Sequence, residues 1–459
     1  MAEPFTALIM AAGHGTRMRS KLPKVLHPVC GKPMVEWVVD AAREAGAQQV
    51  VCVVRPGEGV AEGLPPEVTV AEQCEGEGTG AAVLAARELI APDRPLAVLS
   101  ADHPLVAVQV VSALIAAHAA AAPAATVLTT ESLDPAGYGR VIRAANGAFE
   151  AIVETKRTES LPPEVLATRE INLGTYVFQP DSLFRALERV DQQDGELYLT
   201  GAISAFAEEG GVATSATADA DAARGVNTRA DLMEVEQLAR RRLIAAHARN
   251  GVTFAAPDSV ELHAGVTIGE DTRIGVGATL LGATAIGSGC DIGPHVTARD
   301  AAIGDGVQVT HSYLTECQVE AGASIGPFAY LRPGARIGSR AKIGTFVEIK
   351  NSTIEAGAKV PHLSYLGDAD VGEGANVAAG NITANYDGRE KHRTEIGKDA
   401  KTGVHTSFVA PVSVGDRAYT GAGSVIVEDV PEGALGISRP QQRNVEGYAE
   451  RVEEEEPSP

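Results

Sequence analysis

The chain has 459 residues, of which 44% are apolar, and its formal net charge is −21. A chain of this length exceeds one ordinary hydrophobic core, so we expect two domains. The acidic balance argues against nucleic-acid binding, and the chain has no apolar run that would span a membrane. The sequence does not open on a basic leader and an apolar segment, which predicts a cytoplasmic location.

Residues 1–229 alternate strand-like and helix-like segments. Short apolar runs bounded by turn residues are typical of buried parallel strands, and they occur at Ala7–Met10, Gln49–Val54 and Ala97–Leu99. Helical spacing appears between them, at Met34–Ala45 and Gly80–Leu89. The alternation predicts an α/β domain with a Rossmann-like, mixed and mostly parallel sheet. Ligands of such sheets bind at the carboxyl ends of the strands.

A glycine-containing segment follows the first strand. It reads Ala11-Ala12-Gly13-His14-Gly15-Thr16-Arg17-Met18 and continues to Pro23-Lys24. Glycines at this place let backbone N–H groups approach phosphates closely, and Arg17 and Lys24 add positive charge. The Walker pattern is absent, and Met18 stands where the dinucleotide fingerprint needs a glycine. The segment predicts a phosphate cradle; a tight strand–helix turn without a ligand is the alternative.

Further motifs follow in the first domain. They are Glu72-Gln73, Gly78-Thr79-Gly80, Leu99-Ser100-Ala101-Asp102-His103-Pro104-Leu105, Tyr138-Gly139-Arg140, Ile152-Val153-Glu154, Ile171-Asn172-Leu173-Gly174 and Gly225-Val226-Asn227. With the glycine segment, this series resembles the sugar-nucleotide pyrophosphorylase family, whose members join a sugar 1-phosphate to a nucleoside triphosphate and release pyrophosphate.

That resemblance implies a role for each matching residue. The nucleotide would be bound by Met10, Ala11, Ala12, Gly13, Lys24, Gln73, Gly78, Thr79, Ser100 and Ala101, with Arg17 and Lys24 as the catalytic cations. Asp102 and Asn227 would hold Mg²⁺. The sugar would be positioned by Gly139, Glu154, Asn172 and Asn227.

Asp231–Asn250 is predicted to form one helix, and we assign 230–250 as the linker between the domains. An apolar stripe supports this prediction and consists of Leu232, Val235, Leu238, Leu243 and Ile244. Arg240–Arg242 is expected on the solvent side, and Gly251 is a plausible stop signal.

Residues 251–445 follow a repeat of six. Aliphatic residues recur at this interval in two unbroken runs: Leu262, Ile268, Ile274, Leu280, Ile286 and Ile292, then Val319, Ile325, Leu331, Ile337, Ile343 and Ile349. Neither a helix nor a half-buried strand has this period, whereas a parallel β-helix has it. The repeat slips between Ile292 and Ile303 and breaks at Thr383–Glu395, a polar excursion for which we expect a function.

Three residues of this repeat suggest chemistry. Arg332 and Lys350 are eighteen residues apart, which is three hexads, so they should stack on adjacent coils in an arrangement suited to a phosphate. His362 comes twelve residues after Lys350 and should lie on a neighbouring face. A histidine there could remove a proton from an amine that attacks a thioester, although a structural histidine is the alternative.

Both motif sets together, over residues 5–445, resemble the bifunctional bacterial N-acetylglucosamine-1-phosphate uridyltransferase/glucosamine-1-phosphate acetyltransferase family. This implies acetyl transfer from acetyl-CoA to glucosamine 1-phosphate, then coupling of the product to UTP to give UDP-N-acetylglucosamine for cell-wall synthesis. It also implies a left-handed β-helix and a homotrimer with acetyltransferase sites between subunits.

The same resemblance assigns the residues of the second domain. His362 would be the general base. The sugar phosphate would be bound by Arg332, Lys350, Tyr365, Asn376 and Lys391, and acetyl-CoA by Ala379, Asn385, Tyr386, Val404, Ala422 and Arg439.

Some positions depart from the family pattern and keep alternatives open. His14 replaces the usual lysine of the glycine segment, and Ala101 replaces the glycine before Asp102. The chain could therefore be an acetyltransferase with a weakened or re-specified nucleotidyltransferase domain. A pyrophosphorylase on a trimerising scaffold and a β-helix metalloenzyme with histidine ligands are less well supported. The acidic tail, 446–459, is predicted to be disordered.

Overall fold

The computed structural model describes residues 3–155, 161–192 and 195–455. The chain divides into two compact units, Met1–Arg242 and Leu243–Pro459, so the division falls inside the predicted linker helix. Within the described ranges, every helix is too short or too polar to cross a membrane.

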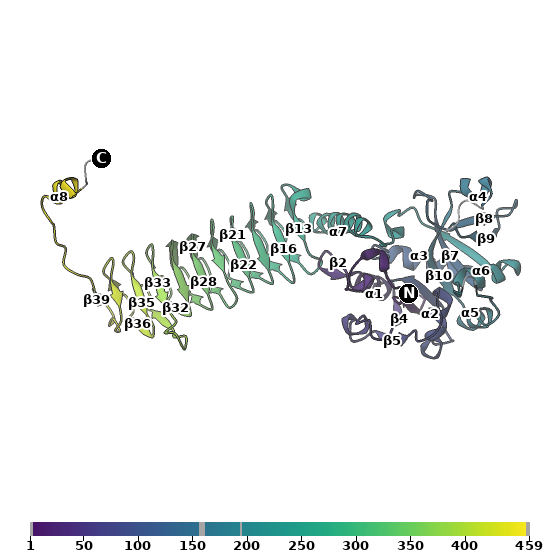
Figure 1. Ribbon diagram of the computed structural model, residues 1–459, viewed down its shortest axis with the longest axis horizontal. Helices are drawn as coiled ribbons and strands as arrows, with labels where there is room; N and C mark the ends of the chain where they lie inside the picture. Colours follow the sequence, from purple (N-terminus) through teal and green to yellow (C-terminus); the bar gives the residue numbers. More distant parts are fainter. Residues whose placement is uncertain (1–2, 156–160, 193–194, 456–459) are drawn as a thin grey trace. The chain divides into compact units, whose positions relative to one another are not determined.

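The first unit is built on a mixed sheet (Figure 1). In spatial order its main strands are β11 (Val212–Ala216), β7 (Ala125–Thr130), β10 (Ile171–Phe178), β6 (Leu96–Ser100), β1 (Phe5–Met10), β4 (Ala47–Val54) and β5 (Thr69–Glu72). The pairs from β6 to β5 and the pair of β11 with β7 are parallel, whereas β10 runs antiparallel to both neighbours. β8 (Arg140–Arg143) and β9 (Phe149–Val153) extend from β10. The prediction of a mostly parallel, mixed sheet is confirmed.

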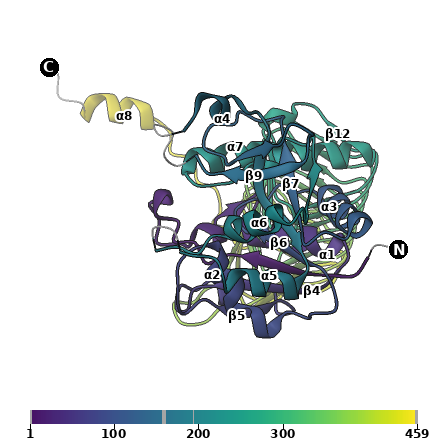
Figure 2. The same cartoon turned by 90° about the vertical axis from the view of Figure 1, so that its right-hand side faces the viewer.

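Helices cover both faces of this sheet (Figure 2). They are α1 (Met34–Glu44), α2 (Thr79–Ala85), α3 (Val108–Ala121), α5 (Pro180–Leu187) and α6 (Leu199–Glu208). The short helix α4 (Pro163–Ala167) contributes no buried side chain to either core. Successive residues of a strand point to opposite faces of the sheet. Ile9 therefore packs in one core with side chains of α1 and α3. Leu8 packs in the other core with side chains of α2, α5 and α6. The helix predicted at Gly80–Leu89 ends earlier: α2 stops at Ala85 and a 3₁₀ turn follows at Arg87–Leu89.

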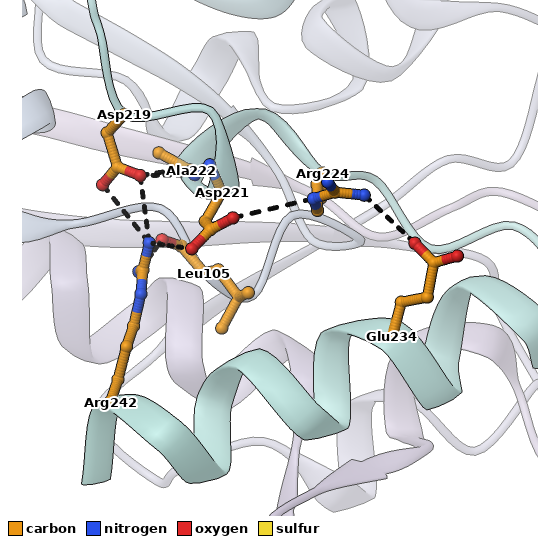
Figure 3. Close-up of polar contacts among 7 residues, drawn as sticks. All are labelled: Leu105, Asp219, Asp221, Ala222, Arg224, Glu234 and Arg242. Carbon is orange, nitrogen blue, oxygen red and sulfur yellow. Dashed lines mark hydrogen bonds and ion pairs between the residues drawn. The ribbon is translucent and has the colours of Figure 1, made fainter. Parts of the chain in front are cut away.

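Helix α7 (Arg229–Arg249) is the predicted linker helix. Thr228 and Asp231 begin it, because each side chain accepts a hydrogen bond from the other residue's backbone N–H. The expectation that Arg242 faces solvent holds only in part, because its side chain is 37% exposed. Its guanidinium donates to the Leu105 carbonyl and to Asp219, and it pairs with Asp221 (Figure 3). A run of three arginines did not reveal this acidic partner surface, which lies more than twenty positions earlier in the chain.

The second unit is a left-handed parallel β-helix whose coils appear as stacked rungs (Figure 1). One face is formed by β12 (Thr253–Phe254), β15 (Arg273–Ile274), β18 (Asp291–Ile292), β21 (Gln308–Val309), β24 (Ser324–Ile325), β27 (Lys342–Thr345) and β30 (Lys359–His362). A second face is formed by β13 (Glu261–Leu262), β16 (Thr279–Leu281), β19 (Thr297–Arg299), β22 (Tyr313–Thr315), β25 (Tyr330–Leu331), β28 (Glu348–Lys350), β31 (Tyr365–Gly367), β33 (Ile382–Ala384), β35 (Ser407–Val409) and β38 (Val425–Ile426).

The third face is formed by β14 (Thr267–Ile268), β17 (Ala285–Ile286), β20 (Ala302–Ile303), β23 (Gln318–Val319), β26 (Arg336–Ile337), β29 (Thr353–Ile354), β32 (Ala369–Val371), β34 (Thr394–Ile396) and β36 (Val412–Val414). Every aliphatic residue of the two predicted runs is buried in a single core, so the hexad prediction is confirmed. The slip of the repeat is a shortened coil: Ile268 pairs with Ile286, but Ile286 pairs with Ile303.

The predicted disorder of the tail needs a correction. Tyr448–Glu455 form helix α8, in which Tyr448 and Val452 are one helical turn apart and both exposed. Residues i and i+4 lie on the same face of a helix, which favours helix formation in this short acidic segment. Residues 456–459 of the predicted tail lie outside the described part.

Candidate active sites

A cavity of about 440 Å³ lies at the carboxyl ends of the parallel strands of the first unit. Met10 pairs with Ser100 and Val53, so the strand ends of β1, β4 and β6 meet at one edge. The cavity is lined by Met10, Ala12, Gly13, His14, Arg17, Lys24, Val25, Arg55, Gln73, Glu77, Gly78, Thr79, Ala82, Ser100, Asp102, Glu196 and Tyr198. This is the place where ligands of open α/β sheets bind.

The glycine segment brings two cations to the cavity. Gly15 has a φ of 57°, and a Cβ there would lie 2.6 Å from the Lys24 Cβ, so glycine is required for both the turn and the approach of Lys24. Arg17 donates to the Asn227 amide oxygen at 2.7 Å. Lys24 donates to the same oxygen at 3.4 Å and to Asp102 at 2.5 Å. The predicted cations are therefore in the cavity.

Asp102 is mostly buried beside Lys24. Burial raises the pKa of Asp102, but the charges of His103 and Lys24 and the hydrogen bonds from Lys24 and Ser100 outweigh it, so the pKa lies below its ordinary value. Burial also lowers the pKa of His103. Asp102 is thus an ionised carboxylate at neutral pH.

Asp102 and Asn227 fit a hard cation. The Lys24 ammonium contacts an oxygen of each, which shows that both oxygens face one positively charged position. Carboxylate and amide oxygens are ligands that Mg²⁺ accepts, usually with water and substrate phosphates completing the set. Among the described residues there is no group of three or more His, Cys, Asp or Glu side chains able to hold a metal.

The predicted base loop is held to the segment before α6. Gly80 N–H donates to the Leu197 carbonyl at 2.7 Å, and the Thr79 hydroxyl accepts from the Leu199 N–H at 3.0 Å. A Cβ at Gly78 would collide with the Leu197 backbone. Gln73 is buried and its side chain donates to the Gly76 carbonyl at 3.0 Å, which orders the loop from within.

Three of the predicted sugar residues lie together. The Asn172 backbone N–H donates to the Gly139 carbonyl at 2.9 Å, and a Cβ at Gly139 would lie 3.6 Å from a Glu154 carboxylate oxygen. The Asn172 amide donates to the Tyr176 hydroxyl at 2.8 Å and is buried. Asn227, the fourth, lies with Arg17 and Lys24 instead.

Two of the predicted nucleotide residues do not line the cavity, since Ala11 and Ala101 are buried in the core. Four polar lining residues were not predicted: Arg55, Glu77, Glu196 and Tyr198. Arg55 follows β4 directly, so its place at the carboxyl end of a parallel strand was a usable signal. Glu77, Glu196 and Tyr198 carry no such signal.

A polar cluster on the second unit brings together residues of three coils. The Lys350 ammonium lies 3.6 Å from Asp368, whose carboxylate also accepts from Asn351 at 2.6 Å and Asn385 at 2.5 Å. Burial raises the pKa of Asp368, but those two hydrogen bonds and the charges of Lys350 and Lys391 bring it below its ordinary value. The excursion after β33 therefore contributes Asn385 to this cluster, and its function stays a prediction.

Lys391 comes from that excursion and meets Lys350. A hydrogen bond from Lys350 and the charge of its ammonium lower the pKa of Lys391. Tyr365 lies near Lys391, because its charge affects the pKa of that lysine. Its hydroxyl lies beside Gly367, as the Asn385 amide does. Two amines held this close, on an accessible surface, would be stabilised by an anion.

Arg332 and His362 occupy the predicted places. Arg332 N–H donates to the Ile349 carbonyl, so Arg332 stacks on the coil of Lys350, and its guanidinium pairs with Glu348 at 2.8 Å. His362 ends β30 on a different face and is exposed. Its carbonyl accepts from the Ser364 hydroxyl at 2.8 Å and from the Gly380 N–H at 3.2 Å.

The remaining predicted residues follow on later coils. Asn376 forms isolated parallel β-bridges with Lys359 and Lys401 on the neighbouring coils. The Ala379 carbonyl accepts a hydrogen bond from the His405 N–H, and the Tyr386 side chain is 60% exposed. Val404 is exposed, and Arg439 donates to the Ala422 carbonyl at 2.8 Å. Arg439 and Ala422 are thus in contact.

Comparison with known proteins supports both halves. Residues 7–209 match the model of the MobA-like NTP transferase domain, and residues 316–351 match the bacterial transferase hexapeptide repeats.

Curated relatives match almost the whole chain. It is 44% identical over 458 residues to the bifunctional protein GlmU of Mycolicibacterium gilvum, covering 97% of this chain and 91% of the relative. It is 43% identical over 457 residues to GlmU of Mycobacterium tuberculosis strain H37Ra (97% and 92%). It is 44% identical over 451 residues to GlmU of Caldanaerobacter subterraneus subsp. tengcongensis (98% and 98%). With two sites of different chemistry on two matching units, the chain belongs to the GlmU family of bifunctional proteins.

Proposed function

We propose that the chain synthesises UDP-N-acetylglucosamine in two steps. The second unit transfers acetyl from acetyl-CoA to glucosamine 1-phosphate, and the first unit joins the product to UTP and releases pyrophosphate. The observation that carries this proposal is the combination of a cavity lined by Arg17, Lys24 and Asp102 in one unit with the polar cluster of Lys350, Asp368 and Asn385 in the other.

In the uridylyl transfer, a phosphate oxygen of N-acetylglucosamine 1-phosphate attacks the α-phosphorus of UTP, and pyrophosphate leaves. Arg17 and Lys24 neutralise charge on the phosphates, which is the main work of a protein in phosphoryl transfer. Asp102 and Asn227 would hold Mg²⁺, which supplies further positive charge against the phosphates. Gly139, Glu154 and Asn172 would orient the sugar.

In the acetyl transfer, the amine of glucosamine 1-phosphate attacks the thioester carbonyl and the CoA thiolate leaves. His362 accepts the proton that the amine loses and returns it to the thiolate. Arg332, Lys350 and Lys391 bind the phosphate, with Tyr365 and Asn376 beside it. Ala379, Asn385, Tyr386, Val404, Ala422 and Arg439 would form the acetyl-CoA site.

We further propose that this second site is completed in a homotrimer. His362 and its neighbour Leu363 are exposed on the single chain, and Leu363 is 59% exposed. A general base works best when water is kept from its substrate, so a second copy covering this surface would serve catalysis.

The test is a split assay on the purified chain. Free thiol is followed with acetyl-CoA and glucosamine 1-phosphate, and pyrophosphate is followed with UTP, Mg²⁺ and N-acetylglucosamine 1-phosphate. Both signals are expected. Thiol release without pyrophosphate release would contradict the proposal and favour the weakened nucleotidyltransferase.

A further inference from the structure

Arg55 and Glu77 line the cavity of the first unit, and the family resemblance gave neither of them a role. Arg55 follows β4, and Glu77 stands between Gln73 and Gly78 in the base loop. The Arg55 side chain is 17% exposed and that of Glu77 is 52% exposed. Arg55 is therefore the enclosed member of the pair.

The guanidinium of Arg55 joins two loops that line the cavity. Its Nε donates to the Ala12 carbonyl in the glycine segment at 2.8 Å. Its Nη2 donates to the Glu77 carboxylate at 2.6 Å. A planar guanidinium presents its N–H groups in a fixed fork, so these two bonds set the separation of the two loops.

The backbone of Glu77 is also held in place, independently of the Arg55 side chain. The Leu197 N–H donates to the Glu77 carbonyl at 2.8 Å, and Glu77 forms a bridge with Glu196. The base loop is thus fixed to the segment before α6, and Arg55 ties that fixed loop to the glycine segment.

The charges around His14 suggest that Arg55 also contributes positive charge to the cavity. His14 is 55% exposed and lies 3.7 Å from Glu58 and 3.8 Å from Glu77. Its ring therefore lies against carboxylates, and the lysine that the family usually has here is missing. Arg55 is a permanent cation on this side of the cavity.

We propose that Arg55 is a positioning residue for UTP and that Glu77 orients it. Resting on the proposed function, the inference is that Arg55 fixes the glycine segment at the distance from the base loop that a uridine nucleotide requires. Disruption should weaken binding of UTP and discrimination between UTP and CTP, because the base-reading loop would lose its fixed distance from the phosphate-binding loop.

The experiment measures KM and kcat for pyrophosphate release with the full-length chain. Arg55→Ala should raise the KM for UTP about tenfold and reduce the preference for UTP over CTP, with kcat and the KM for N-acetylglucosamine 1-phosphate within about twofold. Arg55→Lys keeps the charge but not the fork, so its UTP KM should lie between those of the wild type and Arg55→Ala. Since the two residues act as one unit, the double variant Arg55→Ala/Glu77→Ala should have the same KM for UTP as Arg55→Ala alone.

Arg43→Ala is the matched control, because Arg43 and Glu67 form an exposed pair that does not line the cavity. Its UTP KM should not change. An unchanged UTP KM in Arg55→Ala, a loss confined to kcat, or an equal rise in Arg43→Ala would overturn the inference. Urea unfolding of the same variant reports whether its first unit is folded, because thiol release comes from the second unit. Absence of pyrophosphate release from the wild type would instead refute the proposed function, so the two failures are distinguishable.

Discussion

Lys350 and Lys391 show how single residues reveal a site. The spacing of Arg332 and Lys350 in the sequence placed these two residues on adjacent coils. Only the structure shows that Lys391 lies close enough to Lys350 for the two charges to interact. Each ammonium makes the protonated form of the other lysine less stable, and a bound phosphate would reduce this repulsion.

The lowered pKa of Lys391 gives a pH prediction. A lysine with a lowered pKa loses its proton at a lower pH than the ordinary value of 10.5, so a cation is lost early on the alkaline side. We expect the KM for glucosamine 1-phosphate to rise as the pH increases toward that value. Arg cannot deprotonate in this range, so Lys391→Arg should flatten the rise. Equal pH profiles of the KM for wild type and Lys391→Arg would contradict this assignment.

Other residues show the limit of sequence reading at this scale. The glycine segment with Arg17 and Lys24 could be predicted, because backbone approach to phosphate needs glycine and cations near each other in the chain. Ala101 was expected at the nucleotide, yet its methyl group is buried in the core. The direction of one side chain at a strand end depends on packing that the sequence does not display.

At the scale of elements, the anchoring of α7 differs most from expectation. Arg242 donates hydrogen bonds to the Leu105 carbonyl and to Asp219, and it forms an ion pair with Asp221 (Figure 3). Arg224 forms ion pairs with Asp221 and Glu234. These bonds fix the segment that leads to Asn227. A periodic stripe predicted the helix, but its charged partners are distant in sequence and could not be read from it.

Arg242→Ala tests this anchoring. The substitution removes the guanidinium from the Leu105 carbonyl and from Asp219, which keeps the backbone N–H groups of Asp221 and Ala222 as donors. We expect the free energy of unfolding of the first unit to fall by about 1 kcal/mol, discounted for the partial exposure of Arg242. Arg241 is the exposed neighbour of Arg242. The substitution Arg241→Ala should leave the free energy of unfolding, measured in urea, unchanged. Equal effects of the two substitutions would show that the anchoring bonds contribute nothing.

The coils of the β-helix set the position of His362. Thr345 of β27 pairs with His362 of β30, and Gly344 packs against Pro361 so closely that a Cβ would collide with the Pro361 carbonyl. The hexad pattern predicted these coils well, since a buried aliphatic residue every six positions leaves few other folds. It did not show which glycines allow the coils to approach.

Gly344→Ala should push β27 and β30 apart and displace His362. We expect acetyl transfer to fall about tenfold or more, because small displacements of a catalytic group are costly. Pyrophosphate release from the same protein should remain near the wild-type rate and serves as the internal control. Wild-type thiol release by this variant would mean that the spacing of these coils does not position the base.

At the scale of the whole molecule, two compact units carry two sets of functional groups that share no residue. In the proposed function, the first set binds phosphates in a charged cavity, and the second provides a base and cations on a β-helix surface. The order of both motif sets in one chain made the family recognisable from sequence alone. The bonds between distant segments, such as that of Arg55 with Glu77, became visible only in three dimensions.

The most direct test of the two-site account is a crossed pair of variants in the full-length chain. Thiol release and pyrophosphate release are both measured for Asp102→Asn and His362→Ala. We expect Asp102→Asn to lower pyrophosphate release about a hundredfold or more while thiol release stays near wild type, and His362→Ala to do the reverse. Loss of both activities in either variant, or loss of neither, would contradict the assignment of two separate active sites.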